Sequence, residues 1–509
     1  FILLIACINF MNLSTARATR RATEVGLRKT MGAARATLIG QFLGEAMVIV
    51  AVSIGMSVLL AQLLLPLFNT LTMKEISLTA DSVGFLSLVL VAITVVTGLL
   101  AGGYPAFYLS AFQPARALKG KEALNNSGNV LRRSLVVFQF TIAIALVCAV
   151  VMVSRQLRFM QSKDLGFNAG NKLVVPLRSD AARANHAGFR TEIEKMSTVM
   201  ATTGSSYVPG LPVWNDFSLY PEGGSMDASV NIKNIWVEPN YMEMMGIKLV
   251  AGRRFTANRE SESLNKIILN ETAVKRLGYT PAEIVGKRLY NDSSTGRESY
   301  DVIGVMQDYH QVTPKEAIYP LLFRVPAEQT HHDYIIAGIT GEHFPETIAQ
   351  IGAIWKNINP DTPFEYTFLD QDIKKQYDDD KRVSQVIGSF TAVAMIICCL
   401  GLYGLSTFMA ERRFKEIGVR KVLGATVGQI VQMMSGEFLR LVLIAFALAV
   451  PIAWYALGQW LDNFAYKAPV DITVFIFAGA AALLIALLTV SFESIRAATG
   501  NPVNALRNE

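Results

Sequence analysis

Six uncharged apolar runs constrain the fold of this chain more than any other feature. Each is longer than the roughly 20 residues that a membrane-spanning helix needs, and so many long runs argue against short core helices of a soluble protein. Only 17% of the residues are charged and mean hydropathy is +0.34, which also favours a membrane protein. The runs are Ala46–Met73, Ser82–Ala115, Ser134–Ser154, Val383–Ala410, Leu441–Leu461 and Ile472–Phe492, and Phe1–Ala16 is the tail of a seventh, truncated one.

The loops between these runs predict the orientation. Three loops are strongly basic, whereas the two short opposite loops carry Lys74, Glu75, Asp81 and Asp462, Lys467, Asp471. Because Lys and Arg accumulate on the cytoplasmic side, the three basic loops are expected there and the long polar middle of the chain outside. The basic residues form no aromatic-interleaved patch, so nucleic acid is not expected as a partner. They are Arg17, Arg20, Arg21, Arg28, Lys29, Arg35; Arg116, Lys119, Lys121, Arg132, Arg133; and Arg412, Arg413, Lys415, Arg420, Lys421.

The predicted fold class is a multi-pass α-helical membrane protein with an extracytoplasmic mixed α/β domain. Strands are expected at 172–176, 230–237, 266–269, 300–306, 321–325 and 334–339, and helices at 186–200, 271–277 and 344–357. Apolar residues at helical spacing before Val383 and after Ser154 predict that both adjoining membrane helices extend outward as a stalk. The expected segments are 1–110 (three membrane helices, the first truncated), 111–133 (cytoplasmic linker), 134–156 (membrane helix), 157–381 (exported domain with stalk), 382–497 (three membrane helices) and 498–509 (cytoplasmic tail).

An internal duplication is the most informative pattern. The segment Glu24–Ala33 recurs as Glu416–Ala425, and matches on both sides of it keep the same offset without a gap. Residue 1 then corresponds to Val393, inside a membrane helix, so we expect a longer chain with another helix and exported domain, about 260 residues, upstream. Both halves point the same way, as parallel repeats do.

We call Glu24–Ala33 and Glu416–Ala425 the coupling segments. In each, a Glu precedes an Arg by four residues, basic residues occupy the last turn, and a Gly is placed to end the helix. The pattern predicts a short amphipathic cytoplasmic helix in both halves. A positive-inside anchor with solvated charges is the simpler explanation, but Gly26 and Gly418 each cost a helix about 1 kcal/mol, which favours a surface that a partner approaches closely.

The motif Arg-Arg-x-x-Glu-Ile-Gly-Val-Arg-Lys-x-x-Gly-Ala at 412–425 resembles the signature of FtsX-like permeases, including the MacB-type branch. Ile268–Glu271 and Val302–Val305 are similar to the MacB-type periplasmic core domain. The resemblance implies that the coupling segments dock on a separate ABC ATPase, with ATP and Mg²⁺ held by that partner and no cofactor bound here. The ATPase-coupling residues expected on this basis are Arg20, Arg21, Glu24, Gly26, Arg28, Lys29, Gly32, Arg412, Arg413, Glu416, Gly418, Arg420, Lys421 and Gly424.

Other candidate sites are weaker. The sequence has no Gly-x-x-x-x-Gly-Lys-Ser/Thr motif and no legible nucleophile–base set, so no catalytic residues and no enzyme activity are predicted. The membrane-edge carboxylates Glu45 and Glu437 match between the halves, and anchoring by loop arginines is favoured over a transport role. No metal site is expected: His331, His332 and Asp333 alternate between the faces of a strand, and the other histidines are scattered in sequence.

The predicted function is that of the permease subunit of an ABC-type exporter in the bacterial inner membrane, with its large domain in the periplasm. The alternative is a signalling mechanotransmitter that moves no cargo and controls an extracytoplasmic enzyme or partner. The lipid membrane and an ABC ATPase subunit are the expected partners. If the function is efflux, a periplasmic adaptor and an outer-membrane channel are expected as well.

Overall fold

The computed structural model describes residues 2–77, 80–110, 126–256, 262, 265–293, 296–327, 332–340 and 344–499. The chain divides into two compact units, and each is described by itself. The first comprises Phe1–Gln156, Lys381–Leu461 and Pro469–Glu509, and the second comprises Leu157–Asp380 and Asp462–Ala468.

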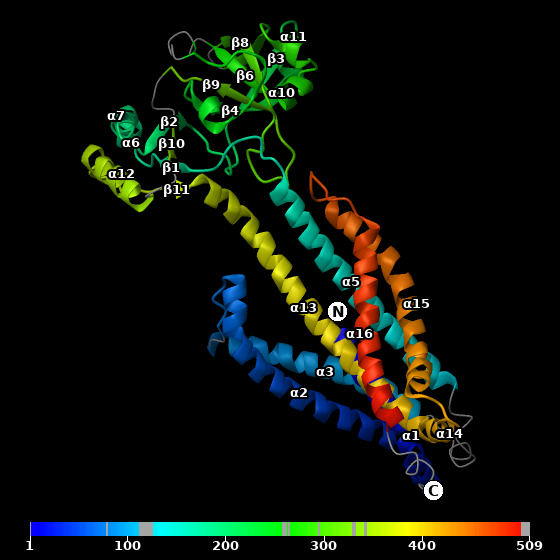
Figure 1. Cartoon of the computed structure of the whole chain (residues 1–509). Coiled ribbons are helices and arrows are strands. Elements are labelled where there is room, and N and C mark those ends of the chain that lie inside the picture. The colour runs from blue at the N-terminus through cyan, green and yellow to red at the C-terminus, as the bar shows by residue number, and fades with distance from the viewer. Residues whose placement is uncertain are drawn as a thin grey trace. The chain divides into compact units, whose positions relative to one another are not determined.

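Long helices make up the first unit (Figure 1). Among the described residues, five of them are long and apolar enough to cross a membrane, namely α2, α5, α13, α15 and α16, and shorter apolar stretches lie in α1 and α3. All seven predicted apolar runs are helical where they are described, except for Met73, which follows the end of α2. The helices are α1 (Ile2–Thr30), α2 (Arg35–Thr72), α3 (Ala80–Ser110), α5 (Asn126–Ser162), α13 (Leu369–Arg412), α14 (Phe414–Val422), α15 (Val427–Leu461) and α16 (Ile472–Thr499).

The expected extensions of two membrane helices are present. Helix α5 continues past its apolar run to Ser162, and α13 begins at Leu369, well before its own run. Neither helix is broken between its polar and apolar parts, because no proline interrupts the hydrogen-bond ladder of either.

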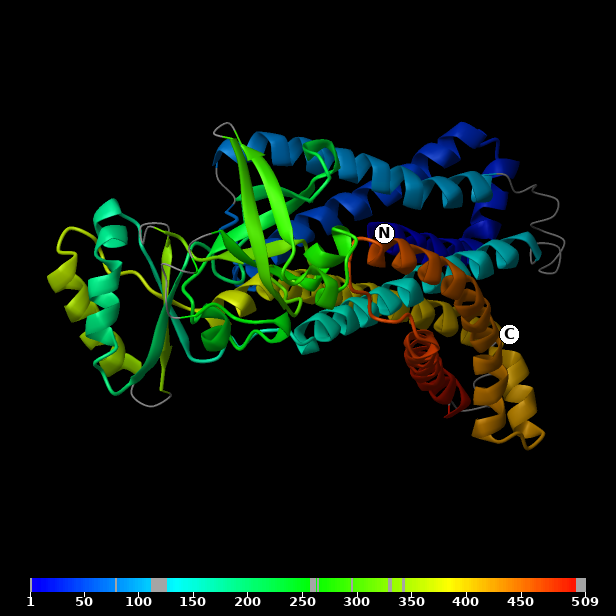
Figure 2. The same ribbon diagram turned by 90° about the horizontal axis from the view of Figure 1, so that it is seen from above.

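Glycines allow close packing of α2 on α3, which lie side by side in Figures 1 and 2. A Cβ added at Gly102 would lie 2.5 Å from the Cβ of Ala46, and one at Gly98 would overlap the sulfur of Met47. The Gly98-x-x-x-Gly102 spacing therefore brings the two backbones together, as small residues do between membrane helices.

We expect Gly102→Ala to lower the free energy of unfolding by about 1–3 kcal/mol, because the new methyl group has no room against α2. Gly103→Ala is the matched control, since a Cβ at Gly103 meets nothing within 4 Å. Thermal unfolding of the two variants in detergent measures the difference, and equal melting temperatures would contradict the packing argument.

The second unit contains a small four-stranded antiparallel sheet in the order β11-β1-β10-β2. Alternate residues of β1 bury opposite faces: Leu173 and Val175 pack with Trp355 under the helices, whereas Val174 packs with Ile235 of the larger sheet. Both faces are therefore covered. The elements are β1 (Lys172–Pro176), β2 (Val199–Ser205), β10 (Tyr334–Ile339), β11 (Thr367–Phe368), α6 (Asp180–Ala184), α7 (His186–Ile193) and α12 (Phe344–Ile358).

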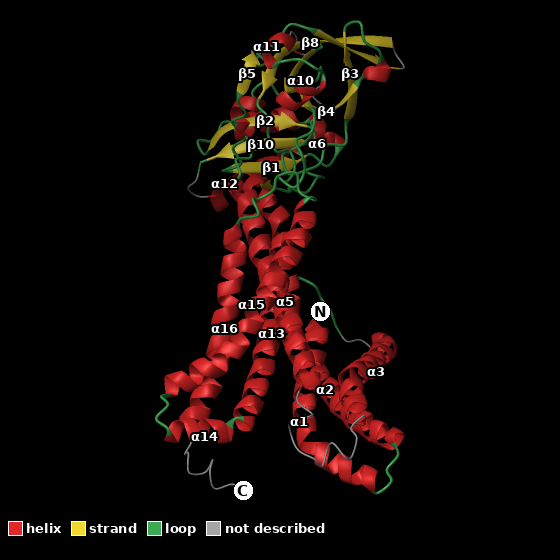
Figure 3. Ribbon diagram, turned by 90° about the vertical axis from the view of Figure 1, so that its right-hand side faces the viewer, coloured by secondary structure: helices red, strands yellow, loops and turns green. Residues whose placement is uncertain are grey.

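The larger sheet of this unit has seven strands in the order β5-β8-β6-β9-β4-β3-β7 (Figure 3). Strand β8 also pairs with β7, so six of the strands close into a ring around an apolar core that includes Leu289 and Val302. The elements are β3 (Asp216–Pro221), β4 (Val230–Trp236), β5 (Leu249–Gly252), β6 (Lys266–Asn270), β7 (Arg288–Ser293), β8 (Gly296–Met306), β9 (Leu321–Arg324), η1 (Met226–Ala228), α8 (Tyr241–Met245), α10 (Glu271–Arg276) and α11 (Pro281–Ile284).

Each of the six predicted strands is present within one or two residues, except that β8 begins earlier, at Gly296. The helix predicted over 186–200 was wrong at its end, because α7 stops at Ile193 and β2 begins at Val199. The β-branched residues Thr198 and Val199 favour an extended backbone, and pairing of β2 with β10 satisfies its hydrogen bonds.

The loop between α15 and α16 belongs to the second unit. The backbone N–H of Ala465 donates to the carbonyl of Lys315 at 2.9 Å, and the ring of Tyr466 packs edge-on against His310 at 5.0 Å. Burial, with help from nearby Lys163, holds the pKa of His310 below its usual value, so the ring is neutral in this contact. The loop is thus fixed to the exported domain by backbone and side-chain contacts.

Candidate functional site

The second coupling segment forms the separate helix that the sequence predicts. Helix α14 begins after a one-residue break at Arg413, which links it to α13. Its charges pair as expected from their spacing, with the Arg420 Nη2 and Glu416 Oε1 atoms 2.9 Å apart. Both side chains are close to half exposed.

One face of α14 is buried against its own chain. Ile417 is only 3% exposed and packs in a cluster with Ile430 and Met434 of α15 and Ala498 of α16. Gly418 is buried beside it. Because Gly418 is already covered by its own chain, it is no longer an argument for a partner.

The first coupling segment departs from the expectation. Residues Glu24–Lys29 continue α1, which is a single helix from Ile2 to Thr30, so no separate short helix forms here. At the break in the second half, the Arg413 guanidinium lies 2.5 Å from Glu437 Oε1 on α15. The side chains of Arg20, Arg21, Glu24 and Arg412, and the surroundings of Gly26, lie outside the described residues.

Both segments end in the same way. Gly32 and Gly424 have φ angles of +92° and +91°, a left-handed conformation that favours glycine. The following alanine donates its N–H to the carbonyl of Arg28 at 3.0 Å in the first copy and of Arg420 at 2.9 Å in the second. This is the Schellman end, and it fixes where the chain turns toward the next membrane helix.

Apolar side chains are exposed at matching positions of the two segments. Leu423 is 81% exposed and its counterpart Met31 is 77% exposed, while Val419 and its counterpart Leu27 are about half exposed. Lys421 and Lys29 lie two residues from each of these positions. This apolar pair was not among the predicted residues, although its recurrence at the repeat offset is visible in the sequence.

The membrane-edge carboxylates are tied to the coupling segments. Glu437 contacts Arg413, and Arg133 of α5 lies 3.9 Å from its other oxygen. In the first half, Arg28 Nη1 donates to Gln41 at 2.7 Å, and Gln41 Nε2 donates to Glu45 at 3.2 Å. These contacts agree with anchoring by loop arginines.

Lys29 and Lys421 are partly exposed at the ends of the two segments. Together with Arg28 and Arg420 they give each copy two basic side chains on the same short segment as the exposed apolar pair. Exposed apolar side chains close to arginine are typical of protein-binding surfaces.

Comparison with known proteins supports the assignment of both units. A family model described as FtsX-like permease C-terminal matches residues 1–114 and again 388–502, which confirms the duplication. A model described as MacB-like periplasmic core domain matches residues 135–354.

Individual relatives are distant. The macrolide export ATP-binding/permease protein MacB of Chromobacterium violaceum is 22% identical over 406 residues, which cover 75% of this chain and 59% of that protein. The uncharacterized ABC transporter permease YvrN of Bacillus subtilis is 23% identical over 418 residues, or 74% of this chain and 96% of that one.

Among solved structures, the periplasmic region of MacB from Actinobacillus actinomycetemcomitans is 15% identical, covers 43% of this chain and 98% of that one, and superposes with a TM-score of 0.31. The two family models together account for most of the sequence, the permease model twice and the core-domain model between its copies. This chain belongs to the FtsX-like ABC transporter permease family and carries a MacB-like periplasmic core domain.

Proposed function

We propose that this chain is the permease subunit that couples ATP hydrolysis by a separate ABC ATPase to movement of its exported domain, and thereby to export of a substrate from the outer face of the bacterial inner membrane. The observation that carries the proposal is the repeated surface at the coupling segments. Each copy has the same helix end, the same basic residues and the same pair of exposed apolar positions.

An uninterrupted helix gives such a docking event a route outward. Helix α13 has 44 residues and is therefore about 66 Å long. At one end of α13, only Arg413 separates it from α14. At the other end, α13 directly follows β11, which pairs with β1 of the exported domain. A displacement of α14 would move a stiff rod whose other end is built into that sheet.

The loop between α15 and α16 supplies a second connection. It groups with the exported domain and contacts Lys315 and His310 there. Helix α15 follows the second coupling segment in the chain, so the same displacement would reach the exported domain through two helices.

The test uses the full-length protein in lipid nanodiscs with the ABC ATPase that co-purifies with it. Replacing Glu416 and Arg420 together by Ala is expected to lower the ATPase rate of the complex about 10-fold. The pair is worth only about 0.5 kcal/mol to the helix itself, so a larger effect has to come from the partner.

A matched pair elsewhere on the same chain is the control. Asp370 and Lys374 are also spaced i,i+4 and lie 2.8 Å apart on α13, outside the apolar run. Replacing both by Ala should leave the ATPase rate unchanged. An equal rate for the two double variants would refute docking through α14.

A further inference from the structure

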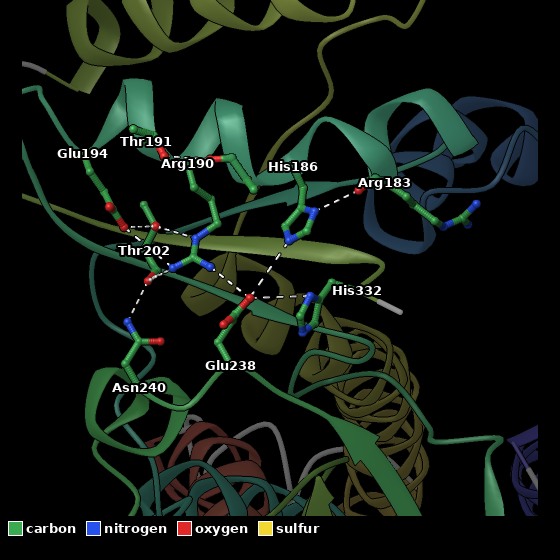
Figure 4. Close-up of polar contacts among 10 residues, drawn as sticks. Arg183, His186, Arg190, Thr191, Glu194, Thr202, Glu238, Asn240 and His332 are labelled. Atoms are coloured by element: carbon green, nitrogen blue, oxygen red, sulfur yellow. Dashed lines mark hydrogen bonds and ion pairs between the residues drawn. The ribbon is translucent and has the colours of Figure 1, made fainter. Parts of the chain in front are cut away.

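We propose that the exported domain contains a binding site for one divalent transition-metal ion of the zinc class, formed by His186, Glu238 and His332. These residues come from three separate segments: the start of α7, the residues after β4 and the residue preceding Asp333 and β10. Figure 4 shows the three side chains pointing toward one another. One ligand-type atom from each lies within 4.8 Å of the others.

The cluster is buried. His186, Glu238 and His332 are 1%, 6% and 0% exposed. Removing a charged side chain from water costs free energy unless an ion pair, hydrogen bonds or a metal ion compensates for it. Buried carboxylates and imidazoles are therefore uncommon without such a role. All three belong to the second unit.

The separations fit an ion better than they fit direct hydrogen bonds. His186 Nε2 lies 4.0 Å from Glu238 Oε1, and His332 Nδ1 lies 3.7 Å from the same oxygen. Hydrogen bonds between such atoms are shorter than about 3.2 Å. Ligand atoms around a tetrahedral zinc ion are roughly 3.4 Å apart, given metal–ligand bonds of about 2.1 Å. Small side-chain adjustments would bring the three atoms into that geometry.

The tautomer of His186 is set in the way that metal ligation requires. Its Nδ1 lies 2.8 Å from the carbonyl oxygen of Arg183, which can only accept, so Nδ1 carries the hydrogen. In the neutral ring Nε2 then directs a lone pair toward the Glu238 carboxylate. Histidines that bind metals commonly donate their other nitrogen to a carbonyl in this manner.

Arg190 holds the Glu238 carboxylate in place. Its Nη1 lies 3.0 Å from Glu238 Oε1, while Nε donates to the Thr202 hydroxyl at 2.8 Å and Nη2 to the Thr202 carbonyl at 3.1 Å. Glu194 lies 3.7 Å from the same guanidinium and offsets part of its charge. Since a carboxylate has four lone-pair positions, Glu238 can accept from Arg190 and still ligate an ion.

The backbone makes room for the ligands at one glycine. A Cβ on Gly204 of β2 would lie 3.0 Å from the His332 ring and 3.3 Å from Glu238 Cγ. The carbonyl of Gly204 also accepts the N–H of Glu238 at 3.0 Å, which fixes that residue beside the small sheet.

The donor set indicates the class of ion. Two imidazoles and one carboxylate suit zinc and its neighbours, whereas calcium and magnesium prefer oxygen ligands alone. Because His186 and His332 flank the small sheet and Glu238 follows a strand of the large one, a bound ion would brace the two sheets of the exported domain.

The sequence could not reveal this cluster. The expectation that His332 and Asp333 point apart was right, since Asp333 turns outward to Arg183 at 2.9 Å. Only the fold brings the side chains of His186 and Glu238 close to that of His332.

The experiment uses the full chain, purified with a tag that contains no histidine and stripped with a chelator, then titrated with Co²⁺ or Zn²⁺ alone. We expect about one ion per chain, with the visible absorption of four-coordinate Co²⁺. His332→Gln should weaken binding at least 10-fold, and Gly204→Ala should weaken it by crowding the ligands. His310→Gln, at another buried histidine of the same domain, should bind as the wild type does.

A second measurement guards against variants that fold poorly. With the ion at about 100 times its dissociation constant, the melting temperature of the wild type should rise by roughly 5 °C. The His310→Gln chain should show the same rise and the His332→Gln chain none. Absence of any shift in the wild type, or uptake that is equal in wild type and His332→Gln, would overturn the proposal.

Discussion

A chain carrying Leu423→Asp is expected to support ATP turnover by its partner ATPase at a rate about 30-fold below that of the wild type. Leu423 is 81% exposed, so the substitution should change the stability of the chain by no more than about 0.5 kcal/mol. At the centre of a protein interface, however, a carboxylate would be stripped of water without a partner. That costs about 2 kcal/mol or more, which corresponds to the stated loss.

The duplication provides the control for this prediction. Met31 occupies the matching position in the first half and is exposed to a similar degree. Met31→Asp should impair the other docking surface, and the double variant should be no better than the worse single one. Leu423→Met should behave as the wild type because it keeps the apolar contact. ATPase rates in nanodiscs measure all four chains, and a wild-type rate for Leu423→Asp would mean that this surface does not receive the ATPase.

Trp355→Ala is expected to lower the free energy of unfolding of the exported domain by about 3–5 kcal/mol. The indole is 1% exposed and packs edge-on against Phe189, with ring centroids 5.0 Å apart. Its Nε1 donates to the carbonyl of Thr362 at 2.8 Å. Truncation would therefore leave both a cavity between α12 and α7 and a carbonyl without its donor.

A second tryptophan of the same domain is the matched control. Trp214 is 78% exposed, so Trp214→Ala should change stability by no more than about 0.5 kcal/mol. Protease resistance of the exported domain as a function of temperature, followed in the full chain, should show a drop of roughly 10 °C for Trp355→Ala. Similar midpoints for the two variants would contradict the packing described for α12.

Membrane helices were predictable because their signal is local. A run such as 441–461 has no alternative to a helix in lipid, where each backbone group has to be paired within its own segment. Two strands of the small sheet were also predictable, since β1 and β10 are short apolar runs buried on both faces. Short, half-polar strands such as β3 and β7 gave no such signal and were missed.

The sequence by itself determined the membrane class, the duplication, the family and the glycine ends of both coupling segments, because each follows from composition or from local backbone preference. Tertiary structure alone decided that α14 separates from α13 while its counterpart continues α1, since the two coupling segments are nearly identical in sequence and local preference cannot tell them apart. It also decided that His186, Glu238 and His332 meet. Side chains far apart along the chain converge only after the sheets have paired. No local sequence pattern shows which of these distant residues will meet.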